Sequence, residues 1–368
     1  MRYIEEFRDG KLAAKLEQDL VREAARLARA ITLMEVCGTH TMSIYRHGLR
    51  SMFPENVKMV SGPGCPVCVT PVGYVDMAIE LARTPGVIIT TFGDMMRVPG
   101  TSSALQKERG AGKDVRVVYT ALDALTVAAN NKNNEVVFLG VGFETTAPSI
   151  ASTIIMAKKL GITNFSVLCA HKVMPEPMEA LTSGQLKLDG YMCPAHVSAI
   201  IGEEGYRPIA GKYGVPCVIT GFEPLDILRG VIMLVRQVAD GRAEVENEYN
   251  RVVLPEGNRK AQAILADVFV KSSAVWRGLG PIPDSGLAIA PKYEAYDAAK
   301  KFGIVEPPSR ENPACVCGEI LKGLKGPQDC PLFGKACVPE NPIGACMVSS
   351  EGTCAAHYRY GAGALAHA

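Results

Sequence analysis

Short apolar runs alternate with segments of helical periodicity along most of the chain. Asp9 can cap a first helix, whose apolar positions recur every three or four residues until about Ala30. The apolar runs that follow have the length and composition of buried strands, and they cover 31–36, 57–60, 86–90, 115–119, 136–139, 165–168, 188–192 and 216–219. Helical periodicity returns between and after them, at 75–83, 121–130, 147–160 and 225–239. Strands that alternate with helices predict parallel sheets with helices on both faces.

The tripeptide Gly-Phe-Glu occurs twice, at 142–144 and 221–223, each time after a strand-like run and before a helix. This short internal repeat is a weak indication of two similar α/β domains, and the polar segment 130–134 is their favoured boundary. A charged helix is expected over 242–251, where the composition changes toward a cysteine-rich region. The predicted organisation is an N-terminal helix over 1–30, α/β domains over 31–130 and 131–225, and a cysteine-rich C-terminal domain over 226–368.

Composition narrows the classes of partner and location. The 368 residues, 48% of them hydrophobic, suffice for two or three domains with buried cores. Lys and Arg number 39 against 38 Asp and Glu, without a block of like charge, so we expect neither nucleic acid nor a membrane surface as a partner. Residues 1–6 lack the order of a secretory signal, and no apolar run approaches the roughly 20 residues that span a bilayer. We therefore expect a cytoplasmic protein, in which thiols stay reduced.

Six of the twelve cysteines fall between Asn312 and Tyr360, among many Gly and Pro residues. They are Cys315, Cys317, Cys330, Cys337, Cys346 and Cys354. Thiolates are soft ligands for zinc, copper(I) or iron–sulfur clusters. Four of them complete one tetrahedral zinc site or one cubane cluster and leave two over. A spare pair beside a redox-active cluster can form a disulfide that the cluster reduces, so we rank an iron–sulfur cluster above a structural zinc ion and above plain disulfides.

Two further thiols occur in Cys65-Pro66-Val67-Cys68, at a predicted strand-to-helix turn. This spacing brings the thiols within disulfide range, and a helix N-terminus lowers the pKa of a thiol. Gly62 and Gly64 supply the permissive backbone that so tight a loop needs. The pattern is typical of a redox or metal-binding dithiol, with two merely buried cysteines as the alternative.

Cys37 and His40 leave three interpretations open: a nucleophile with its base, a pair of metal ligands, or a buried cysteine near a hydrogen-bonded histidine. Core packing is the default for three other cysteines, Cys169, Cys193 and Cys217. Cys193 is the least certain of these because Pro194 and His196 follow it. Glu144 and Glu223 precede helices, where N-terminal capping is a sufficient role. All these clusters follow predicted strands, so they should share one rim of each domain, at the carboxyl ends of the strands where α/β proteins bind ligands, and two rims that face each other would form a cleft.

Four stretches together resemble the HypD family of hydrogenase formation proteins. They are Met34-Glu35-Val36-Cys37-Gly38-Thr39-His40-Thr41, Gly62-Pro63-Gly64-Cys65-Pro66-Val67-Cys68, Gly142-Phe143-Glu144-Thr145-Thr146-Ala147-Pro148 and Gly344-Ala345-Cys346-Met347-Val348-Ser349-Ser350-Glu351-Gly352. The match runs in order from near Met34 to near Tyr360. Motifs of this length in register are highly specific.

The resemblance implies a maturation factor for [NiFe] hydrogenases, a redox-active assembly scaffold rather than a conventional turnover enzyme. On it an iron acquires two cyanides and one carbon monoxide, as a transient Fe(CN)2CO group, before delivery to the hydrogenase large subunit. The implied partners are the small chaperone HypC, which shares the iron, and HypE, which hands over cyanide. The family has two α/β domains and a third that holds a [4Fe–4S] cluster, in surroundings like those of ferredoxin–thioredoxin reductase.

The resemblance also implies roles for individual residues. Cys37 is the expected iron ligand, with His40 beside it, and Cys65 with Cys68 is the exchangeable dithiol. The cluster ligands are expected to be Cys315, Cys330, Cys337 and Cys354, which leaves Cys317 and Cys346 as the nearby redox pair. One alternative is a cluster-dependent disulfide reductase like ferredoxin–thioredoxin reductase, which would leave the Cys37 motif without a role. Another is a binding module held together by zinc.

Overall fold

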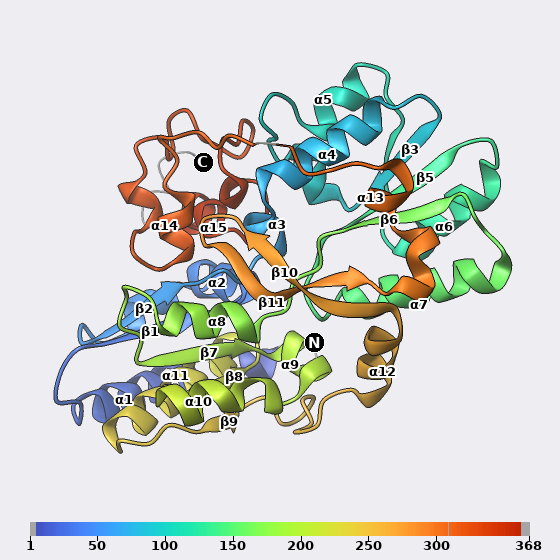
Figure 1. Ribbon diagram of the computed structural model, residues 1–368. Coiled ribbons are helices and arrows are strands. Elements are labelled where there is room, and N and C mark those ends of the chain that lie inside the picture. Colours follow the sequence, from blue (N-terminus) through green and yellow to red (C-terminus); the bar gives the residue numbers. More distant parts are fainter. Residues whose placement is uncertain (1–4, 308, 362–368) are drawn as a thin grey trace.

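Most of the strands form two separate parallel sheets, and a cysteine-rich C-terminal region packs beside them (Figure 1). The computed structural model describes residues 5–307 and 309–361. Residues 1–4 of the predicted N-terminal helix and 362–368 of the predicted C-terminal domain lie outside the described residues. The expected α/β fold with parallel sheets and a cysteine-rich C-terminal region is confirmed.

The first sheet has five parallel strands in the order β2-β1-β7-β8-β9. Their bounds are Val57–Ser61 (β2), Ile31–Glu35 (β1), Gly190–Pro194 (β7), Cys217–Thr220 (β8) and Val245–Asn247 (β9). Helices α1 (Gly10–Ala24) and α11 (Pro224–Ala239) pack together over one face, where side chains such as Leu20 and Leu33 are fully buried. Asp9 caps α1 as predicted, through bonds to two backbone amides, although the helix ends at Ala24.

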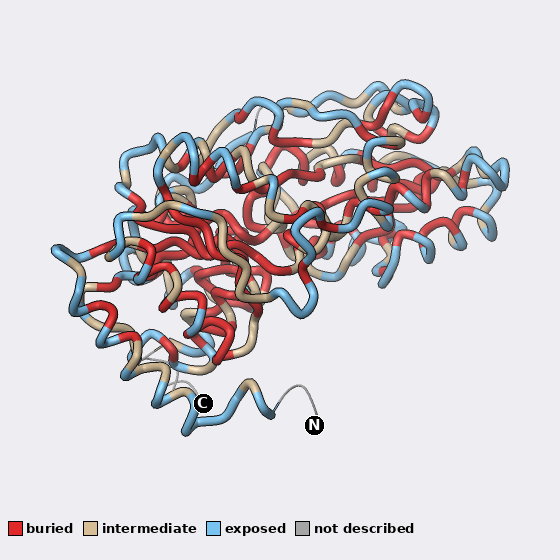
Figure 2. The backbone as a smooth tube through the Cα atoms, turned by 90° about the horizontal axis from the view of Figure 1, so that it is seen from below, coloured by how far each residue is buried: buried red, intermediate tan, exposed pale blue. Residues whose placement is uncertain are grey.

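The second sheet has four parallel strands in the order β4-β3-β5-β6. Their bounds are Val115–Val117 (β4), Val87–Thr91 (β3), Glu135–Gly140 (β5) and Phe165–Cys169 (β6). Helices α4 (Val72–Arg83) and α5 (Leu105–Gly110) cover one face, and α6 (Ala121–Asn130), α7 (Ala147–Leu160) and α12 (Arg259–Val268) cover the other. Buried backbone runs along both sheets in Figure 2, so each sheet has its own core.

The strands do not divide between the sheets at the predicted boundary. Strand β5 lies after the polar segment 130–134 but pairs with β3 before it, and β7 pairs with β1. The first sheet therefore combines residues 31–61 with 190–247, and the second lies within 87–169. This arrangement differs from the predicted domains 31–130 and 131–225. Helix α11 and strand β9 also belong with the first sheet, although the prediction placed β9 and nearly all of α11 in the C-terminal domain 226–368. Local periodicity identifies strands, whereas their pairing depends on contacts far apart in the sequence.

The predicted charged helix over 242–251 is wrong, because this segment contains strand β9. Arg242 donates to Glu244 at 2.6 Å and to Glu246 at 3.2 Å. Side chains two and four residues apart lie on one face of an extended chain. Oppositely charged side chains at this spacing can therefore pair along a strand at the edge of a sheet as well as along a helix.

An antiparallel hairpin that the sequence did not reveal runs between the two sheets (Figure 1, orange). It consists of β10 (Phe269–Trp276) and β11 (Gly280–Ile289). Trp276 near its tip is buried, donates to Ser285 Oγ at 2.8 Å and stacks on Phe143 with ring centroids 5.9 Å apart. The hairpin thereby joins the loop that follows β5 to the core of the first sheet.

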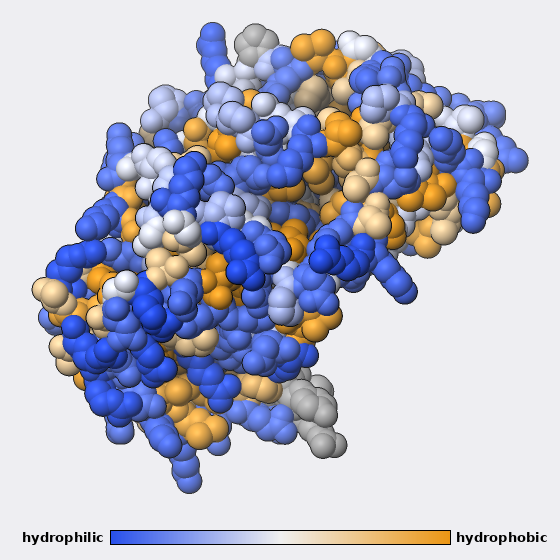
Figure 3. Space-filling model, turned by 60° about the horizontal axis from the view of Figure 1, so that its bottom comes forward, coloured by the Kyte–Doolittle hydropathy of each residue, from blue (hydrophilic) through white to orange (hydrophobic). Residues whose placement is uncertain are grey.

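The C-terminal region consists of turns and short helices, including α14 (Cys317–Leu321) and α15 (Thr353–Tyr360). Helix α15 packs against α2 (Gly38–Arg46), which begins directly after β1. The face drawn in Figure 3 is largely hydrophilic, with small apolar areas between the polar side chains. Among the described helices, none combines the length and the apolar character needed to cross a membrane.

Candidate functional site

The loops that carry Cys37 and Cys65 lie in contact. Each follows a strand of the first sheet, and β1 and β2 are parallel neighbours, so both loops leave the same edge. The amide of Gly38 donates to the carbonyl of Gly64 at 3.0 Å. A Cβ atom on Gly64 would stand 2.1 Å from the backbone nitrogen of Cys37, so only glycine permits this approach. The shared edge expected from the sequence thus brings the two cysteine motifs together.

The Cys37 thiol is buried beside the ring of His196, with 3.8 Å between Sγ and Nε2. Burial, and then the nearby carboxylate of Glu351, raise the pKa of the Cys37 thiol above its usual range. Burial also lowers the pKa of His196 to about 4. A cysteine beside a neutral imidazole offers donor types that suit a soft or borderline metal ion, once the thiol gives up its proton.

The side chain of His40 bonds a different loop, although His40 is only one helical turn from Cys37. Its Nε2 donates to the carbonyls of Thr220 and Gly221 at 3.0 and 2.9 Å, and burial lowers its pKa to about 4. The ring therefore positions the loop after β8, which matches the third of the interpretations left open for His40. The sequence missed His196 as the neighbour of Cys37. The available signal was its position just after Cys193-Pro194, at the end of a strand that pairs with β1.

A buried carboxylate, which the sequence also missed as a site residue, lies directly beneath Cys37. Glu35 accepts the amide of Cys37 at 3.0 Å and the hydroxyl of Thr41. Burial raises the pKa of Glu35 to about 7, against the opposing effect of bonds from Ser61 and Thr41. Glu35 therefore fixes the backbone of the Cys37 loop from below.

The dithiol faces the C-terminal region. Cys65 is the N-cap of α3 (Pro66–Val69), where its thiol accepts the amide of Cys68 at 3.3 Å. Burial, and then a hydrogen bond shared with the Cys346 thiol, raise the pKa of Cys68. Hydrogen bonds from Cys317 and Cys68 lower the pKa of Cys346. Cys346 is therefore the thiol of this group that is best stabilised as a thiolate.

The six C-terminal cysteines surround one small enclosed space, which Ile320, Phe333 and Met347 also line. The Sγ atoms of Cys317 and Cys346 lie 2.6 Å apart, and the other four thiols are Cys315, Cys330, Cys337 and Cys354. No three His, Cys, Asp or Glu side chains among residues 5–307 and 309–361 converge as ligands of a metal ion. The thiols line a common apolar space instead, and this donor set fits a centre held by thiolates.

Comparison with known proteins identifies the family. The HypD family model, described as "Hydrogenase formation hypA family", matches residues 11–361. The chain belongs to the HypD family. It is 49% identical to "Hydrogenase maturation factor HypD" of Rhizobium leguminosarum bv. viciae, over 98% of this chain and 96% of that protein. It is also 49% identical to the protein of that name from Azotobacter vinelandii and 44% identical to that from Escherichia coli K12, over 98% of this chain and 97% and 98% of those proteins.

The Gly-Phe-Glu motif of this HypD-family chain buries its glutamate. Helix α7 begins at Ala147, and Glu144 does not cap it but accepts the amide of Met174 at 2.8 Å. Its second oxygen is buried without a hydrogen-bond partner among the described residues. Burial raises the pKa of Glu144 to about 7. The capping role expected for Glu144 is therefore wrong, and the residue is a buried carboxyl whose pKa is raised toward neutral pH.

Glu144→Gln should remove one source of pH-dependent stability. The folded pKa of about 7 exceeds the value of about 4.3 in an unfolded chain, so the wild type loses free energy of unfolding as pH rises through this window. The amide keeps an acceptor for Met174 and does not ionise. Between pH 5 and 8 we expect the variant to gain roughly 2 to 3 kcal/mol relative to the wild type, measured by urea denaturation.

Glu223→Gln is the matched control, because the glutamate of the second Gly-Phe-Glu tripeptide pairs with Arg8 near the surface. That variant should follow the wild-type pH dependence. The prediction would be contradicted if the free energies of unfolding of Glu144→Gln and the wild type changed by the same amount between pH 5 and 8. Buried histidines titrate in all three proteins, so their contribution cancels in the comparison.

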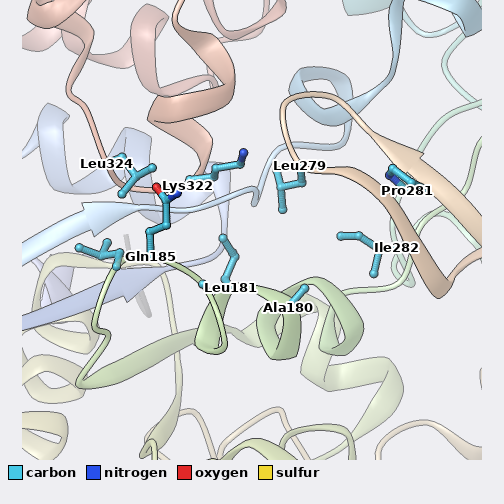
Figure 4. A pocket seen from close by; sticks show the side chains of 10 residues that line it. Ala180, Leu181, Gln185, Leu279, Pro281, Ile282, Lys322 and Leu324 are labelled. Carbon is cyan, nitrogen blue, oxygen red and sulfur yellow. The ribbon is translucent and has the colours of Figure 1, made fainter.

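A separate apolar cavity of about 290 Å³ lies between α8 (Pro175–Thr182), the hairpin and the end of α14 (Figure 4). Leu181 and Leu279 line it, together with Ile282 and Lys322. No cysteine is among its lining residues. It is therefore distinct from the thiol sites.

Proposed function

We propose that this HypD-family protein is a maturation factor for [NiFe] hydrogenases that works as a scaffold. On it a single iron acquires its cyanide and carbon monoxide ligands as an Fe(CN)2CO group. The observation that carries this proposal is the contact between the Cys37 loop and the Cys65–Cys68 loop, with Cys346 next to Cys68. The pocket in which the iron acquires its ligands would then lie next to a dithiol that receives electrons.

Cys37 and His196 would hold the iron. A low-spin iron that carries cyanide and carbon monoxide is a soft centre, and a thiolate suits it better than a carboxylate does. The buried, protonated Cys37 would release its proton when the metal binds. Glu35 and Thr39 would keep the loop in place, since Thr39 donates to Glu351 of the C-terminal region at 2.7 Å.

The cofactor would be a [4Fe–4S] cluster held by Cys315, Cys330, Cys337 and Cys354. When bound, it would supply electrons one at a time. The 2.6 Å contact between Cys317 and Cys346 supports their assignment as the separate redox pair. The partners would be HypC, HypE and, indirectly, the hydrogenase large subunit, in the cytoplasm and without nucleic acid or membrane.

The thiol positions support a defined exchange step. The Cys346 thiolate attacks the Cys68 sulfur of an oxidised Cys65–Cys68 pair, and Cys65 leaves as a thiolate. The Cys317 thiolate then attacks Cys346, which releases Cys68. One disulfide is thereby reduced and one, between Cys317 and Cys346, is formed. Cys346 is the attacking group because the hydrogen bond from the Cys317 thiol, which persists when Cys65 and Cys68 are oxidised, lowers its pKa.

Cys317→Ser should trap the intermediate of this exchange. Without Cys317 the mixed disulfide between Cys346 and Cys68 cannot be resolved onward and can only return through attack by Cys65, so we expect it in roughly half or more of the oxidised protein. Mass spectrometry of peptides prepared without reduction measures it. Cys346→Ser is the control and should keep an intact Cys65–Cys68 disulfide. The proposed exchange step is refuted if the disulfide between Cys68 and Cys346 is absent from Cys317→Ser.

Infrared spectroscopy tests the scaffold proposal. Protein purified anaerobically together with its small chaperone should show bands in the cyanide and carbon monoxide stretching regions. Their absence would overturn the scaffold, and a cluster-dependent disulfide reductase would explain the same thiols. Metal and acid-labile sulfide analysis tests the cluster, since zinc without sulfide would exclude it.

A further inference from the structure

A second cavity, of about 470 Å³, opens against the other side of the C-terminal thiols. Its wall is formed by the tip of the hairpin, the loop at Pro99–Thr101 and the segment at 310–313. Cys315 and Cys317 line both this cavity and the enclosed space, so they separate the two. Cavities of this size commonly bind small molecules.

A buried cation lines this cavity. The side chain of Arg277 is only 3% exposed, and its Nε and Nη2 atoms make no hydrogen bond within the described residues. Burying a guanidinium without partners is costly, so native proteins normally supply an acceptor. Arg277 borders the open cavity but not the space that the six thiols enclose. The missing acceptor therefore belongs in the cavity.

The charges nearby do not supply this acceptor. Glu311 Oε1 lies 3.4 Å from Arg277 Nε, but that glutamate side chain is 44% exposed, and ion pairs with an exposed partner contribute little. Arg310 lines the same cavity and adds a second positive charge. The cavity thus holds two cationic side chains against one anionic side chain.

The hairpin holds Arg277 rigidly in this position. The amide of Arg277 donates to the carbonyl of Val69 at 2.9 Å, just after the Cys65–Cys68 turn. A Cβ on Gly278 would stand 2.3 Å from the Cα of Gly318, so the hairpin tip touches the residue after Cys317. The guanidinium is preorganised, and binding need not order it.

We propose that this cavity binds a small free oxyanion of the phosphate or sulfate type, through Arg277 and Arg310, against the Cys315–Cys317 wall. The planar guanidinium matches two oxygens of such an anion at once. The site is independent of the proposed function, because it requires neither the iron group nor a partner protein. An anion there would lie against two of the thiols assigned to the redox centre.

Calorimetric titration of the anaerobically purified full chain with inorganic phosphate, at constant ionic strength, tests the proposal. We expect saturable binding at one site and at least tenfold weaker binding in Arg277→Met, which keeps the apolar volume of the side chain. The intrinsic fluorescence of Trp276, the single tryptophan and the neighbour of Arg277, should change along the same binding curve.

Two further variants keep the test decisive. Arg310→Glu reverses an exposed charge without disturbing the core, and it should weaken phosphate binding at least tenfold even if Arg277→Met fails to fold. Arg22→Gln, on the exposed face of α1, is the control and should bind as the wild type does. The proposal is overturned if no saturable binding occurs up to about 10 mM phosphate, or if Arg310→Glu binds with wild-type affinity.

Discussion

Cys37→Ser should abolish the infrared bands of the Fe(CN)2CO group, to below about a tenth of the wild-type intensity. A hydroxyl is a harder ligand that does not ionise readily, and it replaces a thiolate poorly at a soft iron centre. The substitution changes one atom in a buried position, so the fold should persist. Infrared spectra of protein purified with the small chaperone, normalised to protein concentration, measure the effect.

Cys169→Ser is a closely matched control. Cys169 ends a strand of the second sheet, and its Sγ lies 3.2 Å from Nδ1 of His171, so it too is a cysteine paired with a histidine. Burial raises the pKa of Cys169 to about 12 and lowers that of His171 to about 3, as burial does for the pair at Cys37. Of these two described pairs, the one at Cys37 lies on the loop that contacts the dithiol loop. Loss of the bands in Cys169→Ser, with retention in Cys37→Ser, would contradict the assignment.

The sequence predicted the elements that local patterns determine. Apolar runs identified the strands, and spacing identified helices such as α6 and α11. It also placed the Cys37 and Cys65 loops at the carboxyl edge of strands. These features depend on residues that are neighbours along the chain.

What the sequence did not predict depends on pairing between distant segments. His196 is 159 residues from Cys37, and it reaches the thiol only because β7 returns to pair with β1. The hairpin was missed because it contains Gly, Pro and a register shift between Ser272 and Ala274, which break the alternating pattern. Arg277 at its tip gave no local signal either. The site is therefore assembled by topology, and only its cysteines were visible in the sequence.

Gly64→Ala should be strongly destabilising, although it removes no functional group. Its Cβ would stand 2.1 Å from the nitrogen and 2.4 Å from the Cα of Cys37. These are backbone atoms, so no side chain can rotate away, and the Cys37 and Cys65 loops must separate. We expect a loss of about 3 kcal/mol in the free energy of unfolding, of the size found for overpacked cores. Urea denaturation measures this loss.

The same separation should also impair the site, since it breaks the bond from Gly38 to Gly64 and moves Cys37 away from Glu35. In Gly64→Ala the infrared bands of the cyanide and carbon monoxide ligands should therefore weaken, and the free energy of unfolding should fall with them. Gly211→Ala is the matched control, because that glycine lies within helix α10 (Arg207–Tyr213) with nothing near its Cβ position. Alanine there should stabilise the helix by about 0.5 to 1 kcal/mol and leave the iron bands unchanged. If Gly64→Ala is as stable as the wild type and keeps its bands, contact between the two loops is not what builds the site.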